Sequence, residues 1–256
     1  MPESWNPDQY LRFRAEREQP FWDLLALVRK KPGMRVCDLG CGTGALTAEL
    51  HRELGARETI GVDSSTAMLA KAPQAPGLRF VEADIADLDE GDPFDLLFSN
   101  AALHWIPDHG ALLERLTRAL APGGQLAFQI PSNDAHPSHE TAFEIAADHR
   151  FKRHFSGSVQ RPTVADPSQY ASWLYHLGYR ERHVRLQVYL HLLPSREDVV
   201  EWVKGALLTP YREKLPEPIW EEFLERYRAL LLSRLPDERP FPYPYPRILA
   251  WGILPE

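Results

Sequence analysis

Short apolar runs alternate with amphipathic stretches through the first half of the chain. Runs of this length that are bounded by turn residues are typical of buried strands, whereas apolar positions spaced three and four apart are typical of helices. The predicted strands are 35–39, 59–62, 78–81, 95–99 and 125–130, and the helices among them are 45–54, 67–71 and 111–120. Because strands separated by helices form βαβ units, the pattern predicts an α/β fold with a parallel sheet covered on both faces.

The pattern changes in the second half. The polar stretch 132–166 contains a predicted helix at 138–150, and a helix over 167–177 is expected to stop at Gly178. A long alternating strand follows, then two helices, then a proline-rich run with interleaved aromatic residues that predicts an ordered, stiff connection into the last strand. The expected ranges are 182–192, 196–207, 219–235 and 247–254, and an amphipathic helix at 21–28 precedes the first strand.

Charge and composition narrow the class of partner. The 256 residues are 44% hydrophobic and carry a formal net charge of −7, so the chain has ample material for a core and lacks the basic balance of a general nucleic-acid binder. We find no apolar run long enough to span a bilayer and no signal-peptide pattern at the N-terminus, which predicts a cytoplasmic protein. Cys37 and Cys41 indicate neither a disulfide framework nor a metal site.

A glycine-rich loop follows the first predicted strand. The segment runs Asp38-Leu39-Gly40-Cys41-Gly42-Thr43-Gly44, where glycines permit a tight turn and close approach of a ligand to the backbone. Asp63 stands nineteen residues after Gly44 at the end of the second strand, where a carboxylate accepts both hydroxyls of a ribose. Together the loop and Asp63 predict a nucleoside site.

The loop spacing distinguishes between nucleosides. A dinucleotide site has Gly-x-Gly-x-x-Gly, because a pyrophosphate binds bare backbone at a helix N-terminus. This loop has Gly-x-Gly-x-Gly and is preceded by Asp38, which repels a pyrophosphate but suits a ligand with an ammonium and a sulfonium. The pattern therefore favours S-adenosylmethionine over a nicotinamide cofactor.

The ends of the next two strands complete a recognisable set. Asp84 is placed to accept from the adenine amino group, Ile85 to pack on the adenine face, and Asn100 ends the fourth strand. Over residues 33–130 the set resembles the class I methyltransferases, which implies a Rossmann-like, mostly parallel seven-stranded sheet with a helical lid. The expected cofactor-binding residues are Asp38, Gly40, Cys41, Gly42, Gly44, Asp63, Ser64, Met68, Asp84, Ile85, Asn100 and, on the N-terminal arm, Arg17.

A narrower resemblance extends over nearly the whole chain. It rests on Trp5-Asn6-Pro7, Asp63-Ser64-Ser65, Phe80-Val81-Glu82-Ala83-Asp84-Ile85, Ser99-Asn100-Ala101, Pro107-Asp108-His109, Trp202-Val203 and Pro246-Arg247. The chain is similar here to the trans-aconitate 2-methyltransferases, which implies methylation of one carboxylate of a small acid. Thr209 departs from the family pattern, in which Arg often precedes the following proline, and Arg212 is a nearby replacement.

The chemistry that this resemblance implies needs no general base. A carboxylate has an unperturbed pKa of roughly 4 and is already ionised at neutral pH. We therefore expect positioning by His104 and Trp105 after the fourth strand, and binding of the substrate by Trp5, Tyr10, His104 and Arg247. Three parts are expected: an N-terminal arm and helix over the active site (1–30), the cofactor core (31–131), and the rest of the sheet with lid insertions near 132–165 and 195–240.

Several alternatives stay open at this point. The cofactor half is compatible with N-, O- or C-methylation of another small metabolite, and a non-catalytic cofactor-binding module or a nicotinamide-dependent oxidoreductase is a competing class. The expected partner is a small carboxylic acid, with no nucleic acid, membrane or metal, and the protein is expected to be a monomer or a small homo-oligomer.

Overall fold

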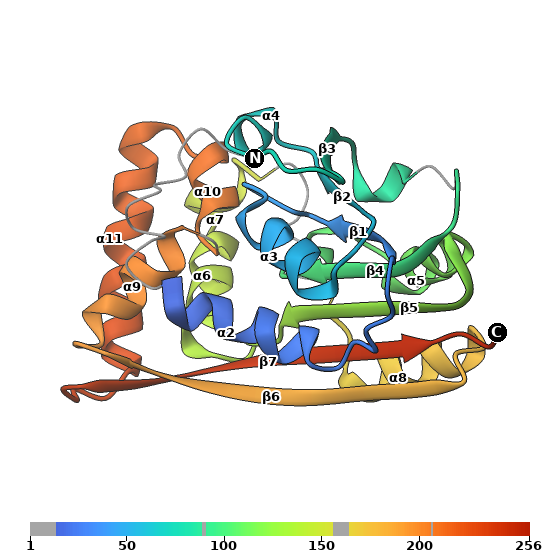
Figure 1. The fold of residues 1–256 in the computed structure, drawn as a ribbon. Coiled ribbons are helices and arrows are strands. Elements are labelled where there is room, and N and C mark those ends of the chain that lie inside the picture. Colours follow the sequence, from blue (N-terminus) through green and yellow to red (C-terminus); the bar gives the residue numbers. More distant parts are fainter. Residues whose placement is uncertain (1–13, 89–90, 156–163, 206) are drawn as a thin grey trace. The chain divides into compact units, whose positions relative to one another are not determined.

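The computed structural model describes residues 14–88, 91–155, 164–205 and 207–256, with the side chains from residue 18 onward (Figure 1). The chain divides into two compact units. The larger unit takes its described residues from Arg17–Ser132, Thr163–Gln187 and Pro246–Glu256, and the smaller one includes described residues of Asn133–Pro162 and Val188–Tyr245. In the part of the chain that is described, none of the helices has the length and apolar character that crossing a membrane requires.

The strands form a seven-stranded sheet in the order β3-β2-β1-β4-β5-β7-β6. Neighbours from β3 to β5 pair in parallel, while β7 pairs antiparallel with β5. The bounds are β1 Arg35–Leu39, β2 Glu58–Asp63, β3 Leu78–Glu82, β4 Phe94–Asn100, β5 Leu120–Pro131, β6 Glu181–Leu193 and β7 Phe241–Ile253. The prediction of a mostly parallel, seven-stranded α/β sheet is confirmed.

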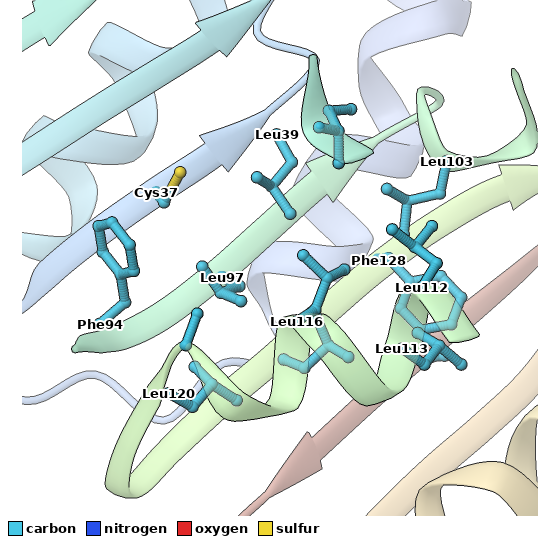
Figure 2. Packing of buried hydrophobic residues seen from close by; sticks show 14 of the residues in the cluster. Cys37, Leu39, Phe94, Leu97, Leu103, Leu112, Leu113, Leu116, Leu120 and Phe128 are labelled. Carbon is cyan, nitrogen blue, oxygen red and sulfur yellow. The ribbon is translucent and has the colours of Figure 1, made fainter. Parts of the chain in front are cut away.

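Alternation along the central strands explains how helices cover both faces of the sheet in the larger unit. Leu96 and Phe98 of β4 pack in one cluster with α2 (Arg14–Leu25) and α3 (Ala45–Leu54). The intervening Leu97 packs in the other cluster with α5 (His109–Arg118) and α8 (Pro167–His176). Figure 2 shows leucines of α5 directed toward this second face of the strands.

The smaller unit is mainly helical and has its own core. Its helices among the described residues are α6 Pro137–Ala147, α7 His149–Lys152, α9 Glu197–Lys204, α10 Thr209–Lys214 and α11 Glu217–Arg234. Trp202, Phe223 and Tyr227 belong to its buried cluster. The helix predicted over 138–150 is divided at Asp148, whose extended backbone ends α6 and whose carboxylate accepts a hydrogen bond from the Arg150 N–H at the start of α7.

The proline-rich run differs from the prediction of a connection, because it forms the first half of β7. Phe241, Tyr243 and Tyr245 are buried, while the intervening prolines are half-buried or exposed. Proline lacks an N–H, and alternate residues of a strand direct their N–H groups to the same side. The prolines therefore remove donors from only one side of β7, so the run is compatible with a strand.

Four smaller differences concern element ends and short helices. The helix α2 lies earlier than the predicted 21–28, and α4 has only the four residues Thr66–Leu69. Leu120 begins β5 instead of ending the preceding helix, because it pairs with Phe94 of β4. The helix α10 and the 3-10 turns η1 (Ile85–Asp87) and η2 (Leu103–Trp105) were not among the predicted elements.

Candidate active site

The glycine loop joins β1 to α3 with three residues in the left-handed region. Gly40, Gly42 and Gly44 have φ angles of 76°, 57° and 71°. The N–H groups of Gly40 and Cys41 both donate to the Val62 carbonyl, at 2.8 and 3.0 Å, which attaches the loop to the end of β2. The predicted loop thus lies at the carboxyl edge of the parallel strands, where open α/β sheets bind ligands.

The three glycines have different surroundings. A Cβ at Gly40 would lie 2.1 Å from the Ala102 Cβ, and one at Gly44 would lie 2.4 Å from the Phe80 ring. A Cβ at Gly42 would meet only the terminal methyl of Met68, at 3.4 Å. Gly40 and Gly44 are therefore required by packing, whereas Gly42 and Met68 border the open side of the loop, where a ligand can approach.

Asp38 lies under the loop at 4% exposure. Its Oδ2 accepts a hydrogen bond of 2.7 Å from the Thr47 hydroxyl of α3. Burial raises the pKa of Asp38 to about 7, the Thr47 hydrogen bond opposes this rise, and the charge of Asp63 adds to it. A buried carboxyl held near its titration point is well suited to a cationic neighbour, which would stabilise its ionised form.

Asp63 connects the loop to the turn after β2. One oxygen accepts from the Gly42 N–H at 2.8 Å and the other from the Ser65 N–H at 2.9 Å. An ionised carboxylate has about four acceptor positions, so two backbone donors do not saturate it. Ser64 is exposed beside this turn, while Ser65 caps α4 and receives a hydrogen bond from Met68 N–H.

The two residues expected to contact adenine lie next to the loop. Asp84 is exposed and accepts from the Ala86 N–H at 2.8 Å, which caps the η1 turn. Ile85 is buried, and its Cδ1 lies 3.5 Å from the position that a Cβ would take at Gly40. Both residues are therefore near the loop, although Asp84 also has a local structural role that the sequence did not reveal.

A hydrogen-bonded chain crosses the carboxyl ends of β4 and β5. Gln129 donates from Nε2 to the Asn100 side-chain oxygen at 2.6 Å and accepts from Arg247 Nη1 at 2.9 Å. Arg247 is only 6% exposed and lies opposite Pro131 in the β5–β7 pairing. These hydrogen bonds hold the Arg247 guanidinium at this edge of the sheet. Gln129, the central residue of the series, was not among the residues predicted from the sequence.

His104 lies on the η2 turn just after β4. Its Nδ1 is buried and has no hydrogen-bond partner among the described residues. Burial, helped by the positive charge of Arg247 and by His109, lowers the pKa of His104 to about 3, so the ring is neutral at physiological pH. Trp105 is 57% exposed, and its ring centroid lies 4.7 Å from that of His104.

Three predicted residues lie wholly or partly outside the described part of the chain. Trp5 and Tyr10 lie outside the described residues, and so does the side chain of Arg17, whose backbone belongs to α2. Arg212 forms an ion pair with Glu217 and packs over Trp220, at 5.6 Å from the ring centroid.

The residues around the glycine loop of the larger unit fit a cationic nucleoside. Asp38 and Asp63 bring two carboxylates to a loop whose Gly42 side is open, and Ile85 supplies an apolar surface beside it. This combination matches the ammonium, sulfonium, ribose and adenine groups of S-adenosylmethionine. A pyrophosphate is not compatible with Asp38 when that residue is ionised.

Comparison with known proteins agrees with this geometry. Residues 30–172 match a family described as a methyltransferase domain. A trans-aconitate 2-methyltransferase of Deinococcus radiodurans is 42% identical over 259 residues, with 99% of each chain covered. One of Escherichia coli O1:K1 / APEC is 38% identical over 233 residues, with 91% of this chain and 90% of the relative covered.

Solved structures share the fold at low identity. The YcgJ protein of Bacillus subtilis has a TM-score of 0.61 at 17% identity, with 95% of this chain and 99% of that chain covered. A phosphoethanolamine N-methyltransferase of Haemonchus contortus, solved with S-adenosylhomocysteine, has a TM-score of 0.57 at 19% identity, with 93% of this chain and 53% of that chain covered. These likenesses confirm the Rossmann-like methyltransferase fold.

Proposed function

The chain belongs to the trans-aconitate 2-methyltransferase family, and we propose that it transfers a methyl group from S-adenosylmethionine to one carboxylate of trans-aconitate or a similar small acid. The structural observation that carries the choice of a carboxylate substrate is Arg247, a buried guanidinium beside neutral His104 at the carboxyl edge of the sheet. Guanidinium groups bind carboxylates with paired hydrogen bonds, which favours an anionic substrate over an amine.

The residues around the glycine loop are proposed to hold the cofactor. Asp63 would accept from the ribose, Ile85 would pack on the adenine, and Asp38 would favour the positive charge of the ligand. S-adenosylmethionine supplies the methyl group, which is activated by its attachment to a sulfonium.

Positioning is the main contribution that the chain makes to the reaction. A substrate carboxylate is ionised at neutral pH, so no side chain needs to remove a proton from it. Arg247 would orient the acid by its charge, and His104 would face it as a neutral ring. Holding the acid and excluding water around it are the steps that accelerate such a transfer.

The test is methyl transfer from labelled S-adenosylmethionine to a panel of di- and tricarboxylic acids that includes trans-aconitate. We expect label on trans-aconitate in a base-labile form, because the product is an ester. Label on another acid but not on trans-aconitate would support methylation of a carboxylate and show that the substrate is a different acid. Tight cofactor binding without label on any acid would refute the proposal.

Replacing Arg247 tests the residue that carries the proposal. We expect Arg247→Ala to raise the KM for the acid by about tenfold or more, while the Kd for the cofactor changes little, because one charge-assisted contact contributes about 1.5–3 kcal/mol. Arg247→Lys retains the charge, so its KM for the acid should lie between those of the wild type and Arg247→Ala. Arg29→Ala is the control at an exposed arginine: Arg29 pairs with Glu181, and its backbone contacts Gln125, which lies opposite Ile253 at the other end of the β5–β7 pairing. Equal acid KM values for all four proteins would exclude Arg247 from the substrate site.

The small acid is the proposed partner. The cytoplasmic location, the absence of a nucleic-acid partner and the roles expected for the arm 1–30 and the lid segments stay predictions from the sequence.

A further inference from the structure

The segment between β4 and α5 has an unusual backbone for its composition. Ala101 and Asp108, at its two ends, have φ angles of 56° and 53°. The left-handed region costs a residue with a Cβ roughly 1 kcal/mol or more, so surrounding contacts must maintain it. The η2 turn with His104 lies between these two residues.

One set of contacts attaches this segment to the cofactor loop. The Ala102 methyl occupies the space that a side chain at Gly40 would need, since a Cβ there would lie 2.1 Å from it. The Ala101 N–H donates to the Gln129 carbonyl at 2.9 Å. The start of the turn is thus in direct contact with the glycine loop and with β5.

A second set of contacts holds the turn from the side of α5. His109 is 4% exposed, and its Nε2 lies 3.0 Å from the Leu103 carbonyl oxygen. The same carbonyl accepts from the Ile106 N–H at 3.0 Å. His109 therefore holds Leu103, the residue directly before His104, by a hydrogen bond from the first turn of α5.

Hydrogen-bonding capacity determines how the protons of this cluster are arranged. A carbonyl oxygen can only accept, so His109 Nε2 must carry a proton. Burial lowers the pKa of His109, which keeps the ring neutral and leaves Nδ1 as an acceptor. The Tyr170 hydroxyl, which contacts Nδ1, must then donate to it, and its oxygen accepts from the Ala165 N–H at 3.2 Å.

We propose that His109 and Tyr170 are a pair of positioning residues for the methyl transfer, holding the η2 turn so that His104 is aligned relative to the cofactor loop. Neither residue needs to touch the acid. The inference rests on the proposed function and adds to it the contacts that orient His104. It follows from the directed order Ala165 N–H to Tyr170, Tyr170 to His109, and His109 to Leu103.

Tyr170→Phe removes the hydroxyl and retains the ring. The ring packs edge-on against Phe128 and Trp173, at centroid distances of 5.5 and 5.3 Å, and these contacts remain in the variant. We expect kcat/KM for the acid to fall by about tenfold or more, because small displacements of a positioning group are costly. The Kd for S-adenosylhomocysteine should stay within about twofold, since the loop itself is unchanged.

Tyr179→Phe is the matched control, at a tyrosine three residues beyond the end of α8. Tyr179 is also buried, and its hydroxyl lies 2.9 Å from the Thr117 hydroxyl near the other end of α5. This variant loses a buried tyrosine hydroxyl bond just as Tyr170→Phe does, but far from the η2 turn. We expect a similar loss of stability in both variants and a loss of kcat/KM only in Tyr170→Phe.

A double-mutant cycle tests whether the two residues act together. We expect His109→Gln and the double variant His109→Gln/Tyr170→Phe to lose about as much kcat/KM as Tyr170→Phe alone, since breaking one connection already releases the turn. Additive losses, or a Tyr170→Phe variant as active as Tyr179→Phe, would overturn the proposal.

A spectroscopic measurement separates this proposal from the proposed function. In protein labelled with ¹⁵N-histidine, Tyr170→Phe should shift the ring nitrogen signals of both His109 and His104, whereas Tyr179→Phe should shift neither. This result would support the positioning role even if no tested acid were methylated. If Tyr170→Phe shifted only the His109 signals, the positioning role would be refuted while acid methylation by the wild type stood.

Discussion

Gly40 combines a backbone requirement with a packing requirement. Its φ angle of 76° favours glycine, and its missing side chain makes room for the Ala102 methyl. A substitution there should therefore disturb both the loop and the segment that leads to His104.

We expect Gly40→Ala to raise the Kd for S-adenosylmethionine by about tenfold or more and to lower stability by more than about 1 kcal/mol. Gly55→Ala is the matched control, because Gly55 has a φ of 54° and nothing within 4 Å of an added Cβ. It should cost about 1 kcal/mol of stability and leave the Kd unchanged. Equilibrium dialysis and urea unfolding measure the two quantities. Gly40→Ala/Ala102→Gly should recover part of the affinity, and no recovery would argue against the clash.

Asp38 predicts a pH-dependent affinity for the cofactor. Burial holds its pKa at about 7, so it is partly protonated at neutral pH. A cationic ligand stabilises the carboxylate, which lowers the pKa and releases a proton on binding. Affinity should therefore rise between about pH 6 and pH 8, by less than about tenfold per unit. Calorimetry in two buffers of different ionisation enthalpy measures the proton release. Asp38→Asn should bind the cofactor without releasing this proton. If the variant released as many protons as the wild type, the proton would come from another group.

At the scale of elements, the start of α6 holds the half-buried His136 and the buried His139. His136 accepts from the Ser138 N–H at 3.1 Å, and the Ser138 hydroxyl lies 2.8 Å from His136 Nδ1 and 3.1 Å from His139 Nδ1. Burial lowers the pKa of each ring to about 4. The cap of α6 therefore depends on neutral histidines.

The pH dependence of stability follows from this arrangement. An unfolded histidine titrates near about 6.5, so between pH 6.5 and 4 the unfolded state binds more protons and stability falls as the pH falls. Removing one such group by His139→Asn should reduce the slope of unfolding free energy against pH by up to about 1.4 kcal/mol per unit. Urea unfolding at several pH values in this window measures it. The exposed His183→Asn should keep the wild-type slope, and an unchanged slope in His139→Asn would contradict the assignment.

At the scale of the whole molecule, each of the two units has its own buried core. Trp202 lies in the core of the smaller unit, and Trp251 lies in the larger unit, where its indole N–H donates to Gln125 at 2.9 Å. The cofactor loop belongs to the larger unit. Units with separate cores are candidates for separate unfolding steps.

We expect S-adenosylhomocysteine at about one hundred times its Kd to stabilise the larger unit by about 2.7 kcal/mol and the smaller unit by less. Urea unfolding of protein labelled with 5-fluorotryptophan, followed by ¹⁹F NMR, resolves the two units. Trp202→Phe and Trp251→Phe assign the two signals. Identical midpoints for Trp202 and Trp251, shifted equally by the ligand, would show that the chain unfolds as one cooperative unit.

Local patterns in the sequence were enough to predict the order of the elements and the cofactor half of the site. Strands 35–39 and 78–81 and the helix 45–54 were predicted within one residue of their observed ends, because the period of apolar positions is a local property. The loop from Asp38 to Gly44 was readable for the same reason, since its turn and its ligand contacts come from neighbouring residues. The resemblance to a methyltransferase family rests on these local motifs.

Elements and contacts that depend on distant partners could be recognised only from the folded structure. The proline-rich start of β7 looked like a connection, and it is a strand because its aromatic side chains fill a core. Gln129 and Arg247 are 118 residues apart, and His109 and Tyr170 are 61 apart. A hydrogen bond between such residues has no periodic trace in the sequence, because it exists only once packing has brought both partners to one edge of the sheet and removed the water that would otherwise compete for them.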